Sequence, residues 1–201
     1  MKKILVWDLP VRLGHWLMVG GFALAWLTGD SEKWRLVHVF AGSTVTAVAL
    51  FRLLWGVVGS RHARFSSFVR GPRQVIVYLK GLLRLSPPHY TGHNPAGGWA
   101  VMLLLILALS AGASGWLTYQ EIGGEWLEEV HESLTGLMLA VVFVHLAGVL
   151  VGSLMHGENL PRAMITGRKR GEQEEAIARP RYIAAVMLLA WTVTAAWWLS
   201  R

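Results

Sequence analysis

Two histidines on one apolar stretch are the side chains best placed to do chemistry in this chain. His131 and His145 lie fourteen positions apart in the segment 130–156, which is apolar enough to span a membrane. At 3.6 residues per turn this interval is just under four turns, so both imidazoles point from nearly one face, about 21 Å apart along the axis. Imidazoles ligate metals and exchange protons, and ionisable groups inside a membrane indicate function. The spacing therefore predicts two similar sites at different depths of a hydrocarbon core roughly 30 Å thick.

The composition indicates a helical bundle in lipid. Hydrophobic residues make up 54% of the 201 residues and charged residues only 15%, which is too apolar for an ordinary water-soluble domain. The chain contains no cysteine. This excludes disulfides, iron–sulfur clusters, thiolate zinc sites and cofactor attachment through a Cys-x-x-Cys-His motif.

Five apolar segments are long enough to form membrane helices. The first follows Asp8, which is placed to cap a helix, and carries Pro10 in its first turn. No small-residue cleavage site follows it, so we expect it to be retained. The five segments cover residues 9–28, 34–58, 99–118, 130–156 and 182–199. The sequence thus predicts an all-α integral membrane bundle of five transmembrane helices.

The basic residues set the orientation of the bundle. The amino terminus and the loops 59–97 and 157–181 hold nearly all the Lys and Arg, and five spans place these three segments on one side. By the positive-inside rule that side is the cytoplasm, so the carboxyl terminus faces outward. Within the first loop, residues 72–85 separate apolar from basic side chains, which predicts a helix lying at the membrane surface. The net charge of +7 then needs no nucleic acid to explain it.

The topology assigns a depth to each histidine near a span. His15 begins the first, outward-going helix and is cytoplasmic, whereas His38 begins the returning helix and lies near the outer side. On the segment 130–156, His131 is outer and His145 is inner. We therefore expect His15 to face His145 and His38 to face His131.

Two facing imidazoles at one depth in lipid suit a six-coordinate haem iron, which they ligate from above and below. Arg52 lies fourteen residues after His38, on the same helix face at the depth of the inner pair. There we expect it to contact a haem propionate; the alternative is that it extends to the cytoplasmic headgroups. Glycines within about a turn of the four histidines would let a flat macrocycle approach the helices: Gly20, Gly42, Gly136 and Gly148.

Four further histidines are not assigned as ligands. His62 and His89 lie in the basic loop, where we expect them in solvent. His93 precedes Asn94, which is placed to cap a helix whose first residue is Pro95. We expect His93 to be a local structural residue, with a quinone pocket as the alternative. His156, at the cytoplasmic end of the segment 130–156, is the main competitor of His145 as inner ligand.

Together these residues resemble the bacterial cytochrome b561 family, which includes the cytochrome b subunits of nickel–iron hydrogenases and formate dehydrogenases. The resemblance extends over about residues 4–168. It is carried by Asp8, Pro10, Arg12, His15 and Trp16, by His38 and Gly42, by the run 52–59 with Arg64 and Phe65, by the run 92–97, and by His131, Glu132 and His145.

The resemblance implies a four-helix core in residues 1–168 that holds two b haems. In that core, the residues at the positions of the family's ligands are His15, His38, His131 and His145. The segment 169–201, a linker and a fifth helix, lies beyond this core, and we expect it to contact a partner or a second copy of the chain. With the charge distribution, the resemblance implies a multi-pass protein of the bacterial inner membrane with a cytoplasmic amino terminus and a periplasmic carboxyl terminus.

We expect the protein to relay electrons between a periplasmic redox partner and the quinone pool, with a quinone site near the inner pair. The partner would be a c-type cytochrome or a hydrogenase or dehydrogenase. Four acidic residues before the fourth span could steer a basic partner, although they are also simply what an outer face retains: Glu121, Glu125, Glu128 and Glu129. Two other function classes stay open. One is a stand-alone quinone oxidoreductase acting on a small soluble substrate, and the other is a non-redox transporter or assembly factor whose histidines bind metal or protons.

Overall fold

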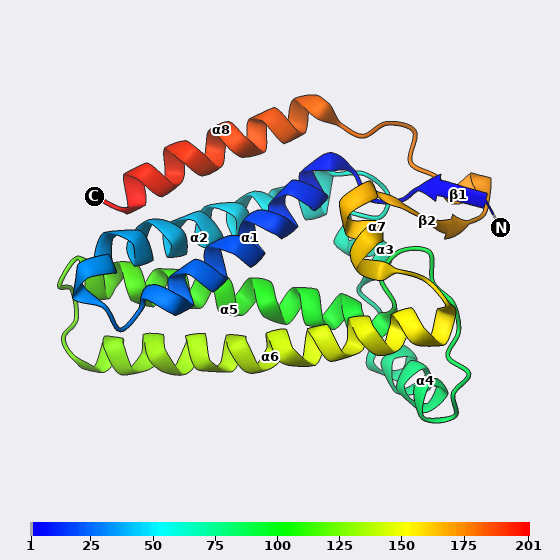
Figure 1. Ribbon diagram of the computed structural model, residues 1–201, viewed down its shortest axis with the longest axis horizontal. Helices are drawn as coiled ribbons and strands as arrows, with labels where there is room; N and C mark the ends of the chain where they lie inside the picture. The colour runs from blue at the N-terminus through cyan, green and yellow to red at the C-terminus, as the bar shows by residue number, and fades with distance from the viewer. Residues whose placement is uncertain (1) are drawn as a thin grey trace.

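Five long helices run along the length of the molecule (Figure 1). The computed structural model describes residues 2–201, so Met1 lies outside the described residues. The long helices are α1 (Leu9–Thr28), α2 (Arg35–Val58), α5 (Pro95–Tyr119), α6 (Trp126–His156) and α8 (Tyr182–Leu199). Among the described residues, four of them are long and apolar enough to cross a membrane: α2 with the turn before it, α5, α6 and α8. The protein is therefore a mostly helical membrane bundle.

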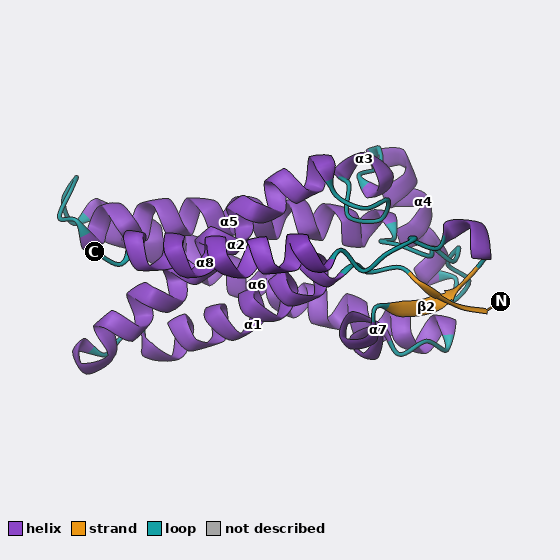
Figure 2. Ribbon diagram, turned by 90° about the horizontal axis from the view of Figure 1, so that it is seen from above, coloured by secondary structure: helices purple, strands orange, loops and turns teal. Residues whose placement is uncertain are grey.

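Four of the long helices pack as two antiparallel pairs. Helix α1 packs along α2 and helix α5 packs along α6, while α2 also contacts α5 and joins the pairs. Helix α8 lies on the outside, against α2 and α1 (Figure 2). It is fixed there by Trp191, whose indole Nε1 donates a 2.8 Å hydrogen bond to the carbonyl oxygen of Ala47. An apolar core between α2, α5 and α6 contains Val45, Ala49, Leu105, Leu107, Ala108 and Met138.

The helix ends depart from the predicted bounds at three places. The segment 34–58 begins with a 3-10 turn, η1 (Glu32–Trp34), before α2. Helix α5 begins at Pro95, four residues before the predicted membrane span, and its predicted cap Asn94 is confirmed, since the side-chain oxygen accepts a 2.7 Å hydrogen bond from the Gly97 amide. Helix α6 also begins early, at Trp126, which brings acidic residues into its first turn, where they interact favourably with the helix dipole.

Short elements gather at one end of the bundle, which we call the basic end. They are the helices α3 (Phe65–Phe68), α4 (Pro72–Leu83) and α7 (Leu160–Thr166), the turn η2 (Gln173–Glu175) and the strands β1 (Lys2–Leu5) and β2 (Arg168–Gly171). Helix α4 corresponds to the predicted surface helix and ends two residues earlier. The strands pair antiparallel, with Lys2 opposite Gly171 and Leu5 opposite Arg168. This sheet was not predicted, because four-residue basic strands carry no hydrophobic alternation.

A small apolar core closes the basic end. It consists of Ile4, Val6, Trp7, Val11, Ala63 and Ala163. The carbonyl oxygen of Gly167 accepts hydrogen bonds from the backbone amides of Val6 and Trp7, at 2.8 and 3.0 Å. The amino terminus and the loops 59–97 and 157–181 therefore share one end of the bundle, as the sequence predicts.

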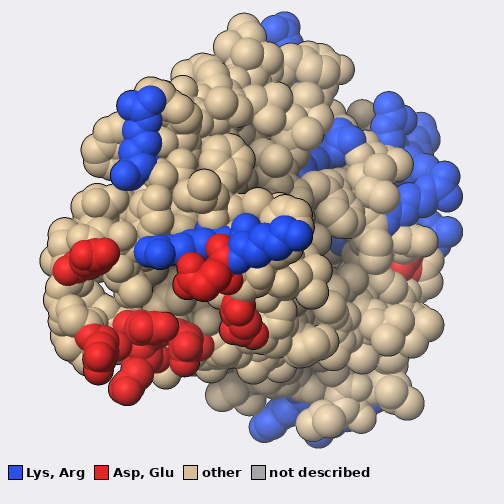
Figure 3. All heavy atoms as spheres, turned by 60° about the vertical axis from the view of Figure 1, so that its left-hand side comes forward, with Lys and Arg blue, Asp and Glu red and all other residues tan. Residues whose placement is uncertain are grey.

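The two ends of the bundle carry opposite charge. All Lys and Arg residues except Lys33, Arg35 and Arg201 belong to the basic end. At the other end, which we call the acidic end, carboxylates gather around the loop that joins α5 to α6 (Figure 3). They belong to Asp30, Glu32, Glu121, Glu125, Glu128, Glu129 and Glu132.

Asp8 ties the start of α1 to the end of α2 and is fully buried. Its Oδ1 accepts a 2.9 Å hydrogen bond from the Val11 amide, and its Oδ2 accepts one of 2.9 Å from Trp55 Nε1. We expect Asp8→Ala to lower the free energy of unfolding by roughly 2–3 kcal/mol, since it removes a helix cap and leaves a buried indole N–H unpaired. Thermal unfolding in detergent measures this effect.

The matched control for this prediction is Asp30→Ala, which makes the same change at an exposed position. We expect it to leave the unfolding temperature close to that of the wild type. Equal unfolding temperatures for the two variants would contradict a stabilising role for Asp8.

Candidate functional site

The rings of His38 and His131 face each other near the acidic end. Their centroids are 6.0 Å apart and their planes are inclined by 79°. His38 Nδ1 lies 2.8 Å from the carbonyl oxygen of Ala25 on α1, and His131 Nδ1 lies 2.9 Å from that of Ala111 on α5. Because a carbonyl oxygen only accepts, both Nδ1 atoms carry the proton and both Nε2 lone pairs are free to bind a metal.

The rings of His15 and His145 face each other nearer the basic end. Their centroids are 6.5 Å apart and their planes are inclined by 58°. The ring of His15 also packs edge-on against Trp16, at 5.2 Å. Helix α6 thus contributes one histidine to each pair, while α1 and α2 contribute one each. The structure brings together the same two pairs that the topology predicts.

The separation within each pair suits one metal ion between the two rings. With a metal–nitrogen bond of about 2 Å and about 1.1 Å from the nitrogen to the ring centre, two imidazoles on opposite sides of one metal have centroids about 6.2 Å apart. The observed separations, 6.0 and 6.5 Å, lie on either side of this value. Two protein ligands are fewer than a protein zinc site uses, and they match the two axial positions of haem iron.

Four glycines beside the pairs face open space. A Cβ atom built at Gly20, Gly42, Gly136 or Gly148 would meet no atom within 4 Å. All four lie on α1, α2 or α6, within about a turn of a paired histidine, which are the positions that the sequence predicts for contact with a flat ring. The residues around the pairs therefore fit a haem.

Gly115 on α5 is in close contact with a neighbouring side chain, unlike the four glycines above, and the sequence did not predict it. A Cβ there would lie 2.7 Å from Cε1 and 2.8 Å from Nδ1 of His131, so only glycine leaves room for this ring. The available signal was the spacing of small residues on α5, which in membrane helices permits close approach of a neighbour.

Arg52 is buried inside the basic end, with 8% of its surface exposed. Its Nη2 donates a 2.9 Å hydrogen bond to the carbonyl oxygen of Ala63, and its guanidinium lies 5.1 Å from the ring centre of Phe65 and 5.9 Å from that of Phe68. These contacts hold the side chain within the protein rather than extended toward the headgroups. Its Nη1 is buried and has no hydrogen-bond partner among residues 2–201.

His62 is not in solvent as expected; only 8% of its surface is exposed. Its Nε2 donates a 2.8 Å hydrogen bond to the carbonyl oxygen of Glu175, because the linker folds back over the loop that carries His62. Burial lowers the pKa of His62 below its ordinary value. His156, the competitor of His145, packs against His89 at 5.3 Å instead of facing His15.

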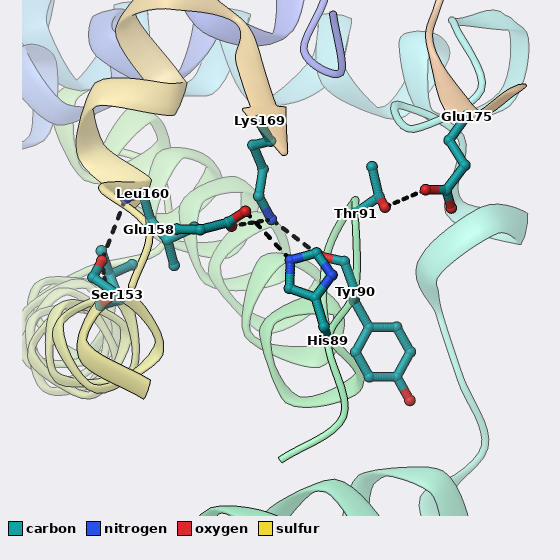
Figure 4. A network of polar contacts seen from close by, with 9 residues as sticks. His89, Tyr90, Thr91, Ser153, Glu158, Leu160, Lys169 and Glu175 are labelled. Carbon is teal, nitrogen blue, oxygen red and sulfur yellow. Dashed lines mark hydrogen bonds and ion pairs between the residues drawn. The ribbon is translucent and has the colours of Figure 1, made fainter. Parts of the chain in front are cut away.

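A polar network joins the loops of the basic end (Figure 4). Glu158 pairs with His89 at 3.3 Å and with Lys169 at 3.4 Å, and Lys169 Nζ also donates a 3.0 Å hydrogen bond to the carbonyl oxygen of Tyr90. Beside them the Thr91 hydroxyl donates to the carboxylate of Glu175. Burial lowers the pKa of Lys169, and the carboxylate of Glu158 opposes this shift. The network fixes the loop before α5 against β2 and η2.

The helix arrangement and the two imidazole pairs fit a membrane cytochrome of the b type. Residues 6–167 match the family model of prokaryotic cytochrome b561, and the chain belongs to that family.

Three relatives show the range of similarity. The probable Ni/Fe-hydrogenase B-type cytochrome subunit of Bradyrhizobium diazoefficiens is 24% identical over 83% of this chain and 86% of its own. The protein of the same name from Rhodobacter capsulatus is 29% identical over 70% of this chain and 63% of its own. The probable Ni/Fe-hydrogenase 1 B-type cytochrome subunit of Escherichia coli K12 is 28% identical over 58% of this chain and 60% of its own. No solved structure matches the chain.

The family membership fixes the general function. The protein is a multi-pass bacterial membrane cytochrome that transfers electrons, and its cofactor is haem b. Of the function classes that the sequence leaves open, the non-redox transporter or assembly factor is thereby set aside.

The contact between Gly115 and His131 yields a test of the site near the acidic end. We expect Gly115→Ala to lower the haem content. The added methyl group must displace the His131 ring and break the hydrogen bond from its Nδ1 to the carbonyl oxygen of Ala111. The reduced-minus-oxidised absorption spectrum of the purified protein measures the bound haem. The matched control is Gly71→Ala, where a Cβ meets no atom within 4 Å. Full haem content in Gly115→Ala would show that the ring position is not needed for binding.

Proposed function

We propose that the protein carries two b haems and relays electrons between a periplasmic redox partner and the quinone pool. His15 and His145 would hold the haem iron nearer the basic end, and His38 and His131 would hold that nearer the acidic end. The observation that carries the proposal is that the two imidazole pairs have nearly the same separation, 6.5 and 6.0 Å. Haem b, when bound, supplies a one-electron carrier whose iron alternates between the ferric and ferrous states.

Helix α6 sets the distance between the two sites. Fourteen residues of helix separate its two ligands by about 21 Å along the axis, which places them at two depths of the membrane. The histidines on α1 and α2 come from opposite ends of an antiparallel pair, so each meets one ligand of α6.

We propose that α1 is a fifth membrane crossing. It has 20 residues and packs along α2, and its polar residues Arg12 and His15 lie near its start. The four-helix core in residues 1–168 then holds both haems, with 169–201 as linker and outer helix. By the positive-inside rule the basic end is cytoplasmic, and the carboxyl terminus is periplasmic. Helix α8 exposes an apolar face toward lipid, a partner or a second copy of the chain.

Arg52 supports the site nearer the basic end. A buried guanidinium needs a compensating anion or a full set of hydrogen bonds, and its Nη1 lacks a partner among the described residues. We propose that this nitrogen donates to a propionate of the inner haem, which supplies the negative charge.

The partner is proposed to be a hydrogenase, a dehydrogenase or a c-type cytochrome in the periplasm. The relatives described above are named as subunits of Ni/Fe-hydrogenase, which supports an oxidoreductase partner. The proposed docking surface is Glu121, Glu125, Glu128 and Glu129, all exposed and next to His131 at the start of α6. Electrons leave to quinone near the inner pair.

The ligand assignment is tested by removing each histidine and counting haems. We expect His15→Ala and His145→Ala each to remove the same haem, and His38→Ala and His131→Ala each to remove the other, since bis-imidazole ligation needs both rings. Haem-to-protein stoichiometry and an optical redox titration measure the loss. His89→Ala serves as the control and should keep both haems. Loss of different haems in His15→Ala and His145→Ala would refute the pairing.

The docking surface is tested by neutralising it. We expect a variant with Glu125, Glu128 and Glu129 changed to Gln to slow the reaction with a basic c-type cytochrome about tenfold at low salt, because electrostatic steering is lost. Stopped-flow kinetics over a range of ionic strength measure this rate. Gln at Glu172 and Glu174, on the basic end, gives the control. An unchanged rate at low salt in the first variant would end the docking proposal.

A further inference from the structure

Unsatisfied polar atoms gather at the basic end. Among residues 2–201, five buried side-chain atoms have no hydrogen-bond partner, and only Thr192 Oγ1 on α8 lies away from that end. The other four are Arg12 Nε, Arg52 Nη1, Ser60 Oγ and His93 Nδ1. A buried donor without a partner costs about 1–3 kcal/mol, so such groups are normally satisfied by a bound molecule or by water. Their clustering points to a bound polar group.

The ring of His93 is held rigidly in this cluster. It lies 4.7 Å from the ring centre of Trp7 and 4.4 Å from that of Phe68. Asn94 and Pro95, the next two residues, start α5 as its cap and first helical position, so the backbone is fixed as well. Burial, assisted by the positive charge of Arg52, lowers the pKa of His93 to about 3. The ring is therefore neutral and has one N–H donor.

His93 and Arg52 pack against the same aromatic side chain. Phe68 packs against both groups, with its ring centre 4.4 Å from that of His93 and 5.9 Å from the guanidinium carbon of Arg52. The carboxylate of Asp8 is already occupied by the Val11 amide and Trp55 Nε1, and the ion pairs among the described residues do not include Arg52. Arg52 Nη1 and the imidazole Nδ1 of His93, which both lack a hydrogen-bond partner among the described residues, therefore form a site for a carboxylate.

The neighbouring histidines indicate which carboxylate this is. His93 packs against Trp7, which lies just before the start of α1, and both Arg12 and His15 lie in the first two turns of that helix. We propose that His93 donates a hydrogen bond from Nδ1 to a propionate of the inner haem, beside the contact of that propionate with Arg52 Nη1. This inference rests on the proposed function, and it assigns His93 a positioning role that neither its sequence context nor the family resemblance specifies.

The role has a measurable consequence for the inner haem. Without the N–H donor, the negative charge of the propionate is less compensated, which stabilises the ferric state. The midpoint potential of the inner haem then falls, and its pH dependence extends to higher pH because the propionate holds its proton more tightly. A residue that only packs against Trp7 and Phe68 would produce neither effect when replaced by an apolar ring.

The test compares three variants of the full-length haem-loaded protein in detergent. His93→Phe keeps an aromatic ring and removes the donor, whereas His93→Asn keeps an N–H donor and loses the ring. His62→Phe is the matched control, since His62 also packs near Trp7, at 6.4 Å, but its N–H is paired with Glu175. Optical redox titrations at several pH values, together with haem stoichiometry, give the readout.

We expect His93→Phe to lower the inner midpoint potential and extend its pH dependence, while His93→Asn stays close to the wild type and His62→Phe is unchanged. Loss of the inner haem in His93→Phe but not in His93→Asn would also support the donor role. The proposal is overturned by an unchanged potential in His93→Phe, by equal shifts or haem loss in both His93 variants, or by the same shift in His62→Phe.

Two further outcomes are distinguishable. Slower quinone reduction in His93→Phe with unchanged potentials would assign the donor to quinone and overturn the propionate contact. Fewer than two haems in the wild-type protein would refute the proposed function itself. With two haems present, the outcomes above concern only His93.

Discussion

The facing of two imidazoles at about 6 Å is the constraint on which the rest of the structure depends. Helix α6 presents both of its histidines toward the antiparallel pair α1 and α2, while it packs broadly only against α5 and, near its end, α7 among the described residues. Helix α5 packs along α6 and also supplies the carbonyl oxygen of Ala111, which orients His131. The close approach of α5 at Gly115 is thus part of the same constraint.

The two sites are built alike but not equally. The rings of His38 and His131 each donate to a backbone carbonyl oxygen, which raises the basicity of the ligating nitrogen. Among the described residues, no such bond orients His15 or His145. Arg12 lies one turn before His15, and Arg52 is buried at the same end of the bundle. In the proposed arrangement, the more basic nitrogens of His38 and His131 would favour the oxidised form of a haem at the acidic end. The positive charge of Arg12 and Arg52 would favour the reduced form of a haem at the basic end.

Much of this arrangement could be predicted from single residues whose surroundings are local. Contacts within a few turns determine the helix caps Asp8 and Asn94 and the fourteen-residue interval on α6. The basic residues of the loops indicate which loops lie at the same end of the bundle. The sheet of β1 and β2 and the burial of His62 depend on segments more than a hundred residues apart meeting at the basic end. The hydrophobic periodicity of a sequence does not indicate contacts between such distant segments. Gly115 was missed for the same reason, since its partner lies on another helix.

The basic end shows why those long-range contacts matter for the chemistry. The amino-terminal strand brings Trp7 against His93, the loop after α2 brings Phe68 beside Arg52, and the linker covers His62. None of these segments supplies a histidine to either pair. Together they exclude water from the cationic and neutral donors next to the inner pair, and a donor in a dry site acts more strongly on a carboxylate than the same donor in water. The linker that follows α7 therefore helps to bury the donors of the basic end through its pairing with β1.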